Sequence, residues 1–136
     1  MSYFLFKTEP TEYSYADLVR DKRTVWEGVR NPTALGYLRT VKKGDTVVIY
    51  HSGEKEAVGL AVAVSDAYPD PKLEDAKRVV VDIGPDHALS KPVPLSVFRA
   101  DPTLATTELV RISRLSVMPL SAAHFKQILK LSGTAS

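Results

Sequence analysis

Two β-branched runs limit most strongly what this chain can fold into. Residues Thr46–Tyr50 and Val58–Val64 have the apolar, β-branched character of strands, and the segment between them is polar. Two such runs in succession predict a β-hairpin, so the fold contains antiparallel strands.

Further short strands are predicted along the rest of the chain. The apolar run Tyr3–Lys7 predicts a buried strand, and Arg78–Ile83 predicts another that is turned by Gly84-Pro85-Asp86. Residues Pro92–Phe98 are interrupted by proline, which indicates an edge strand leading into a short helical turn. Apolar and polar side chains alternate over Leu109–Val117, and this pattern predicts a half-buried strand.

Three capping signals indicate where helices begin. Ser14 has a carboxylate three residues later, at Asp17, which is the pattern of a capping box. Asn31 directly precedes a proline, and this pair favours the first turn of a second helix. Ser121 caps a final helix that Gly133 ends. Strands spread along the chain, with helices near the N-terminus and at the C-terminus, predict an α+β fold with a small, mostly antiparallel barrel or curled sheet.

Length and composition indicate one domain over residues 1–136, because 136 residues with 44% hydrophobic character are ordinary for one globular unit. The chain has no cysteine, which excludes disulfides, thiolate metal sites and a cysteine nucleophile. No apolar run approaches the ~20 residues of a membrane helix, and the N-terminus lacks the pattern of a signal peptide. We therefore expect a cytoplasmic protein without membrane contact. A net charge of +2 is only mildly basic, so any nucleic-acid contact would be local.

The sequence contains little that indicates an enzyme. His51, His87 and His124 lack the spacing of metal ligands, and neither a phosphate loop nor a dinucleotide fingerprint is present. His51 and Ser52 are adjacent, so on a strand they would point to opposite faces. A small hydrolase or transferase using these two residues is the most remote interpretation. We expect no catalysis, no cofactor and no metal.

One segment, Trp26–Pro32, combines the only tryptophan with a glycine, an arginine and an asparagine. Two interpretations stay open. Trp26 could fill the core, as most tryptophans do, and the segment taken alone favours that. Alternatively, its indole could stack on a flat heterocycle while backbone amides beside Gly28 and the Asn31 amide read the ring edge. Arg30 is suited to a phosphate.

Five segments together, in this order along the chain, resemble the EVE-domain family of the PUA-like superfamily, which includes the thymocyte nuclear protein of eukaryotes. They are Tyr3–Pro10, Trp26–Asn31, Tyr50–Ser52, Tyr68–Pro71 and Ser113–Pro119. The resemblance implies a PUA-like small β-barrel, mostly antiparallel, with flanking helices and one pocket. It also implies recognition of modified bases in nucleic acid, notably 5-substituted cytosines.

The resemblance also implies site residues. Trp26 would be the stacking wall. The implied base pocket comprises Trp26, Val29, Asn31, Tyr50, Ser52, Leu115 and Ser116. The implied polar rim comprises Lys7, Thr8, Arg30, His51 and Arg114. One departure is the stretch Ala34-Leu35-Gly36, where members of the family often carry a basic residue.

Removing a base from a stack costs a few kcal/mol, and stacking on an aromatic side chain returns ~1–3 kcal/mol. Burial of one methyl group adds about 1 kcal/mol at most. We therefore expect a monomeric, non-enzymatic domain that binds a 5-methylcytosine-like base in DNA or RNA, with single strands favoured over duplexes. The alternative is a domain that binds a free nucleobase or nucleoside, whose affinity would hardly depend on salt.

Overall fold

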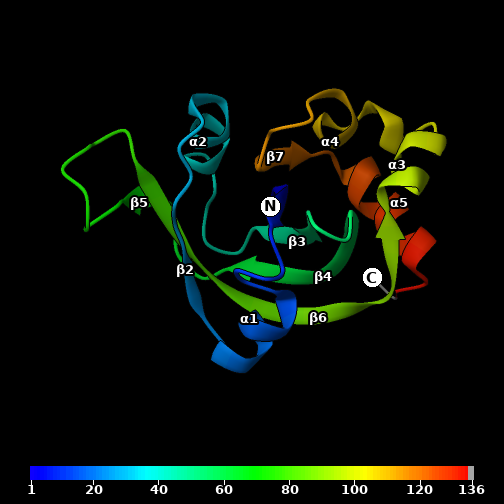
Figure 1. Cartoon of the computed structure of the whole chain (residues 1–136), viewed down its shortest axis with the longest axis horizontal. Coiled ribbons are helices and arrows are strands. Elements are labelled where there is room, and N and C mark those ends of the chain that lie inside the picture. The colour runs from blue at the N-terminus through cyan, green and yellow to red at the C-terminus, as the bar shows by residue number, and fades with distance from the viewer. Residues whose placement is uncertain (135–136) are drawn as a thin grey trace.

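The computed structural model describes residues 1–134, which form one curled sheet flanked by helices (Figure 1). The strands are β1 (Tyr3–Thr8), β2 (Thr24–Trp26), β3 (Thr46–His51), β4 (Glu56–Ala63), β5 (Tyr68–Pro69), β6 (Val79–Pro94) and β7 (Val117–Leu120). Their order is β2-β6-β4-β3-β1-β7, with β5 paired to β6. The β1–β3 pair is parallel, and the other pairs are antiparallel.

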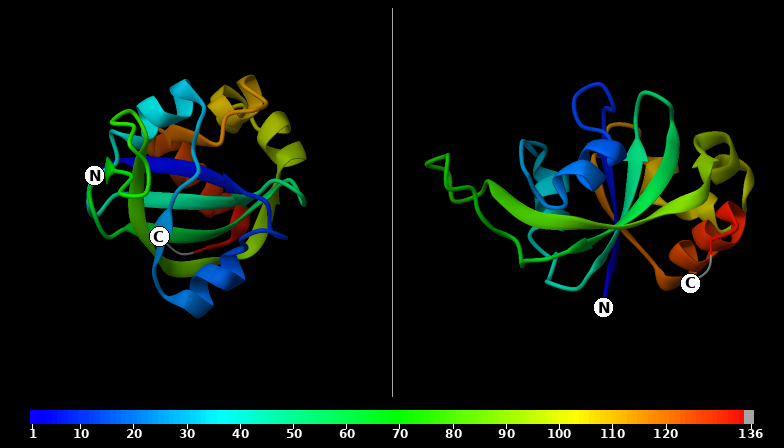
Figure 2. Two further views of the ribbon diagram at one scale, coloured as in Figure 1. Left: turned by 60° about the vertical axis from the view of Figure 1, so that its left-hand side comes forward. Right: turned by 90° about the horizontal axis from the view of Figure 1, so that it is seen from below.

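The sheet curls into a half-barrel (Figure 2). The long strand β6 pairs with β4 on one side and with β2 on the other, so it bends across the whole molecule. Its register against β4 shifts between Ala57 and Gly59 and again between Gly59 and Ala61. Such irregularities bend a strand and increase its local twist. The predicted α+β class with a small, mostly antiparallel barrel-like sheet is confirmed.

The helices lie at both ends of the sheet and below it (Figure 1). They are α1 (Tyr15–Asp21), α2 (Pro32–Leu38), α3 (Leu95–Ala100), α4 (Glu108–Arg111) and α5 (Ala122–Ser132), with a 3₁₀ turn at Leu104–Thr106. In the view of Figure 1, α2 lies near one end of the sheet, α3, α4 and α5 gather near the other, and α1 lies below β6.

The three predicted helix starts are confirmed. The Ser14 hydroxyl accepts a hydrogen bond from the backbone N–H of Asp17, and the Asp17 carboxylate accepts one from Ser14. The Asn31 side-chain oxygen accepts from two backbone N–H groups of α2. Ser121 caps α5, and Gly133 ends it in the left-handed conformation, with φ of 68°. Each cap satisfies backbone donors or acceptors that a helix end leaves unpaired.

The predicted strand over Leu109–Val117 is wrong. The first part of this segment is the single turn of α4, and only Val117 belongs to a strand. A helical turn followed by an extended loop buries Leu109 and Leu115, leaves Val110 partly buried and exposes residues 111–114. The apolar Ile112 is thus exposed, which a half-buried strand would not predict, and strand pairing on β1 begins only at β7.

The predicted turn at Gly84-Pro85-Asp86 is also wrong. These residues continue β6, in which Gly84 lies opposite Val62 and Pro85 lies opposite Ala61. Proline is tolerated within a sheet where the ladder is irregular, and the register shift at Ala61 supplies such a place. The prediction of a strand leading into a short helical turn over Pro92–Phe98 agrees better with the structure. Strand β6 ends at Pro94, and α3 follows directly.

Candidate functional site

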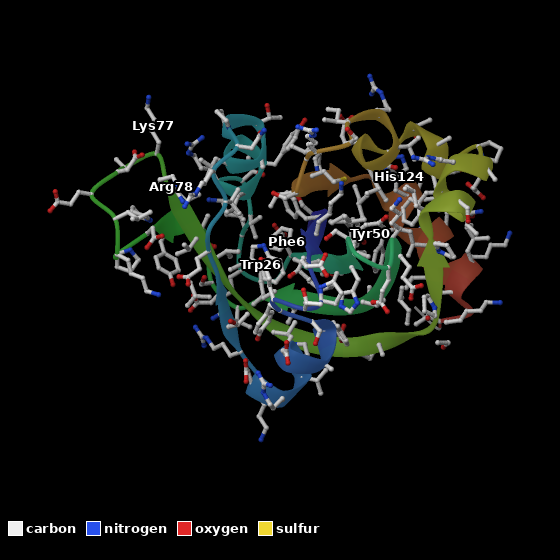
Figure 3. The ribbon with its side chains drawn as sticks, in the orientation of Figure 1. Phe6, Trp26, Tyr50, Lys77, Arg78 and His124 are labelled. Carbon is white, nitrogen blue, oxygen red and sulfur yellow. The ribbon has the colours of Figure 1, made fainter. Side chains whose placement is uncertain are left out.

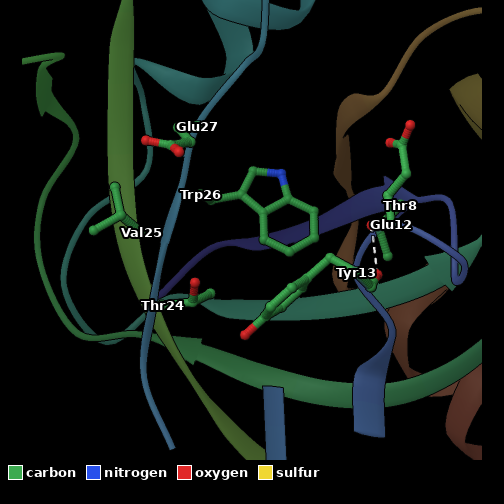
Figure 4. Close-up of a pocket in the computed structure, with 7 residues that line it drawn as sticks. All are labelled: Thr8, Glu12, Tyr13, Thr24, Val25, Trp26 and Glu27. Carbon is green, nitrogen blue, oxygen red and sulfur yellow. Dashed lines mark hydrogen bonds between the residues drawn. The ribbon is translucent and has the colours of Figure 1, made fainter. Parts of the chain in front are cut away.

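A pocket of about 280 Å³ opens beside the only tryptophan (Figure 4). The residues that line it come from the end of β1, the loop before α1, β2 and the residue after it. They are Thr8, Glu12, Tyr13, Thr24, Val25, Trp26 and Glu27. Three chain segments therefore build this pocket, and the curl of the sheet brings them together.

Aromatic packing holds Trp26 in place (Figure 3). The indole lies 5.4 Å from the ring of Phe6, measured between centroids, with the planes tilted by 40°. Tyr13 meets the same indole edge-on, at 6.4 Å and 82°. Phe6 is fully buried whereas Trp26 is half-buried, so the core supports the indole while part of it stays accessible. Edge-on and tilted contacts are favourable geometries for aromatic pairs.

The second aromatic wall, Tyr13, is fixed at both ends. The Thr8 hydroxyl donates a hydrogen bond of 2.7 Å to the backbone oxygen of Tyr13. The Tyr13 hydroxyl donates one of 2.9 Å to Oδ2 of Asp21. Desolvation raises the pKa of Tyr13, so its hydroxyl stays protonated near neutral pH. The wall therefore presents a neutral ring with a fixed position.

The charged groups in the pocket are carboxylates. Glu12 and Glu27 line it, and neither lysine nor arginine does. Glu27 forms an ion pair with Lys72, at 3.2 Å between Oε2 and Nζ. In Figure 4 the carboxylate of Glu27 is turned away from the indole of Trp26. An ionised carboxylate only accepts hydrogen bonds, so this pocket suits a ligand edge that carries donors.

Other predicted segments meet at the end of β1. The backbone N–H of Lys7 donates to the oxygen of Ser116 at 2.8 Å, and its Nζ donates to the oxygen of Ser113 at 3.1 Å. The same Nζ lies 5.9 Å from the centroid of the Tyr50 ring. Desolvation lowers the pKa of Lys7 from its ordinary value. The backbone N–H of Ser52 donates to the oxygen of Thr8 at 2.9 Å.

His51 is held by protein partners on both ring nitrogens. Its Nε2 accepts the backbone N–H of Tyr15 at 3.0 Å, and its Nδ1 lies 2.6 Å from Oε1 of Glu54. Both contacts are satisfied when the ring hydrogen is on Nδ1. The Ser52 hydroxyl donates instead to the oxygen of Thr8, at 3.4 Å. This arrangement does not favour the hydrolase interpretation, because His51 has no free nitrogen to activate Ser52.

The structure divides the predicted base-pocket and rim residues into two sets. Trp26 and Thr8 line the pocket. The remaining predicted residues do not line it: Val29, Asn31, Tyr50, Ser52, Leu115, Ser116, Lys7, Arg30, His51 and Arg114. Among these, Val29, Tyr50 and Leu115 are buried in the core. Contacts of any of these residues with a base stay predictions.

Several pocket residues were not among the predicted site residues: Glu12, Tyr13, Thr24, Val25 and Glu27. The available signal for Tyr13 was its position directly before the Ser14 capping box, where an apolar residue commonly packs against the fold. Val25 and Glu27 flank the tryptophan itself. Nothing in the sequence connects Glu12 to β2, because that proximity depends on tertiary packing.

The half-barrel and the aromatic pocket define a PUA-like α+β domain. Residues 2–131 match the model of the EVE domain, and the chain belongs to the EVE domain family. Thymocyte nuclear protein 1 of mouse is 31% identical over 98% of this chain and 74% of its own length.

Two solved structures show the same fold. Rpa0253 from Rhodopseudomonas palustris has a TM-score of 0.93 at 39% identity, over 98% of this chain and 94% of that one. The human THYN1 protein in complex with DNA containing 5-methylcytosine has a TM-score of 0.89 at 27% identity, over the full length of both chains. The fold and family expected from the sequence are thus confirmed.

Within residues 1–134, the helices lack the length and apolar character needed to cross a membrane. In the same part of the chain, His, Asp and Glu side chains do not gather in threes as metal ligands would.

Proposed function

We propose that this protein is a non-enzymatic reader of a modified base in nucleic acid, and that the Trp26 pocket holds a 5-methylcytosine-like base outside the stack. The accessible indole of Trp26, supported by buried Phe6 and bordered by Tyr13, is the observation that carries this proposal. The likeness to the human THYN1 protein, solved with DNA containing 5-methylcytosine, supports the same ligand class.

The size of the pocket suits one base. Its volume of about 280 Å³ lies just below the ~300–1,000 Å³ that small-molecule pockets usually have, so it has room for one small ring. A pyrimidine stacked on Trp26 gains ~1–3 kcal/mol, which offsets the few kcal/mol needed to extrude it from a duplex. Single strands avoid most of that cost, so they should bind more tightly than duplexes.

The polar edge of the pocket favours cytosine over thymine. Cytosine carries an exocyclic amino group that donates, and a carboxylate is its usual side-chain partner. Glu12 offers such an acceptor, and it forms no ion pair within residues 1–134. Thymine has an acceptor oxygen at the corresponding position, which a carboxylate would repel. The methyl group is the same in both bases, so Glu12 would supply the selectivity.

A second candidate function is binding of a free nucleobase or nucleoside. The lining of the pocket favours it specifically, because Glu12 and Glu27 are the charged groups there and would repel a phosphate. Affinity for a nucleoside would then exceed affinity for any strand and would hardly change with salt. The predicted monomeric state and cytoplasmic location stay predictions under both functions.

The quenching of Trp26 fluorescence tests the proposal, because this is the only tryptophan in the chain. Short single strands with cytosine or 5-methylcytosine, as DNA and as RNA, are titrated at two salt concentrations, alongside the free nucleosides. We expect saturable quenching that is stronger with the modified strand and weaker at high salt. Quenching by the nucleoside alone would replace the proposal with the second candidate.

Substitutions at Trp26 test its role directly, with fluorescence anisotropy of a labelled strand as the readout. Trp26→Ala should weaken binding of the modified strand by about 5- to 150-fold, the equivalent of ~1–3 kcal/mol. Trp26→Phe retains an aromatic face and should restore part of that affinity. Equal affinities of both variants and the wild type would show that the base does not stack on this residue.

A further inference from the structure

A second groove, of about 590 Å³, lies between α2 and the loop that precedes β6. Its lining residues are Arg30, Pro32, Leu35, Arg39, Asp75, Ala76, Lys77 and Arg78. Four of these side chains are cations and one is a carboxylate. We call the four cations, Arg30, Arg39, Lys77 and Arg78, the basic cluster.

The charge of the basic cluster is not neutralised by ion pairs. Within residues 1–134, none of its members forms a salt bridge with a carboxylate. Two members instead bond backbone oxygens: Arg39 Nη2 donates to Lys77 at 2.7 Å, and Arg78 Nε donates to Val29 at 3.1 Å. These bonds position the guanidinium groups while leaving N–H donors available.

Two other cations near the Trp26 pocket are already paired. Arg23 lies 2.7 Å from Asp82, and Lys72 lies 3.2 Å from Glu27. In the part of the chain that the structure describes, the four members of the basic cluster are not paired with carboxylates in this way. Planar guanidinium groups bind phosphate oxygens in bidentate fashion, and a lysine adds a mobile point charge.

The groove is close to the Trp26 pocket. Only three residues separate Trp26 from Arg30, so their Cα atoms lie at most about 14 Å apart. The hydrogen bond from Arg78 to the backbone oxygen of Val29 holds the start of β6 against the segment between Trp26 and Arg30. Figure 3 shows Arg78 beside the segment that leads into α2, with Lys77 projecting outward from the loop.

We propose that the basic cluster binds the phosphates of the strand whose modified base enters the Trp26 pocket. This inference rests on the proposed function. With this arrangement the base and the phosphates contact different surfaces. The carboxylates of the Trp26 pocket are then compatible with binding of a negatively charged strand. Pro32 and Leu35 give the groove an apolar part against which a sugar can pack.

The test compares two double variants with equal loss of charge. Arg30→Gln with Lys77→Gln removes two exposed members of the cluster. Lys126→Gln with Lys130→Gln removes two exposed lysines of α5, which gathers with α3 and α4 away from α2 (Figure 1). Binding of a single strand with one 5-methylcytosine, as DNA and as RNA, is measured at 50 and 200 mM salt. Binding of the free 5-methylated nucleoside is measured in parallel.

Each lost phosphate contact should reduce the slope of log affinity against log salt by about 0.7. For the cluster variant, the ratio of affinities at the two salt concentrations should therefore fall by about sevenfold. The α5 variant should behave as the wild type, and nucleoside binding should be unchanged in both. A larger loss with RNA than with DNA, or the reverse, would identify the polymer that the groove prefers.

Equal salt slopes in the two double variants, with strand binding retained, would overturn the role of the basic cluster and leave the proposed function intact. Absence of quenching by every modified strand and nucleoside in the wild type would overturn the proposed function, and the groove proposal with it.

Discussion

Phe6 and Trp26 are in ring contact although their strands are far apart in the sheet. Phe6 belongs to β1 and Trp26 to β2, and β3, β4 and β6 lie between these two strands in the order of pairing. The contact at 5.4 Å therefore spans the inside of the half-barrel. Because Phe6 is fixed in the buried core, its contact with Trp26 holds the accessible indole in place.

Phe6→Leu should weaken base binding beyond its effect on stability. The smaller side chain leaves a gap beside the indole, and we expect the free energy of unfolding to fall by about 1 kcal/mol. Phe98→Leu is the matched control, since Phe98 is equally buried but belongs to α3. Urea unfolding should give similar losses for both, whereas only Phe6→Leu should reduce affinity for a modified strand. Similar affinities would show that Phe6 does not position Trp26.

Glu12→Gln should reduce discrimination between 5-methylcytosine and thymine in otherwise identical single strands. Glutamine offers both a donor and an acceptor, so the repulsion of the thymine oxygen is relieved. Glu27→Gln makes the same change of charge at the same pocket and is the matched control. Both variants should bind strands somewhat more tightly because a negative charge is lost. A ratio of the two affinities that changes equally in both variants would contradict the role of Glu12.

Gly59→Ala should destabilise the fold, and Gly36→Ala should stabilise it. A Cβ at Gly59 would collide with the ring of Tyr15, whose hydroxyl donates a hydrogen bond of 2.7 Å to the oxygen of Leu60. We expect a loss of about 1–3 kcal/mol, because this ring fixes α1 on β4. Gly36 lies inside α2, where an added Cβ meets nothing within 4 Å. Alanine there should add about 0.5–1 kcal/mol of unfolding free energy, measured by urea titration.

Asp82 should make stability depend on acid pH. The hydrogen bond from Arg23, assisted by one from Tyr68, holds the pKa of Asp82 below its ordinary value of about 3.9. A lowered folded-state pKa stabilises the protein above the ordinary value, and this contribution is lost as the pH falls through the lowered pKa. Asp82→Asn should therefore flatten the fall in unfolding free energy below about pH 4. If the unfolding free energy of this variant falls as steeply below about pH 4 as that of the wild type, the hydrogen bonds of Asp82 contribute no net stability.

Tyr68 should make stability depend on pH in the alkaline range. Its hydrogen bond to Asp82, 2.6 Å long, raises the pKa of the Tyr68 hydroxyl to about 12. A raised folded-state pKa gives stability below the ordinary value of about 10 that is lost as the pH rises through about 12. Tyr68→Phe should remove this dependence, as followed by Trp26 fluorescence in urea at each pH.

The sequence by itself determined the helix starts and the central hairpin. The caps at Ser14, Asn31 and Ser121 use hydrogen bonds that reach two or three residues, so the local sequence contains all of their partners. The strand pattern of β3 and β4 is likewise local, because the two β-branched runs and the polar segment between them are adjacent in the chain. The ordered motifs of the EVE domain family added the global fold.

Only the tertiary structure decided which polar and aromatic groups meet. Alternation over Leu109–Val117 cannot distinguish a strand from a helical turn followed by a loop, since both bury Leu109 and Leu115. Glu12 and Tyr13 line the same pocket as Trp26 because the curl of the sheet closes β1 toward β2. That curl follows from strand twist and register shifts accumulated across the whole sheet, so short sequence patterns do not contain it.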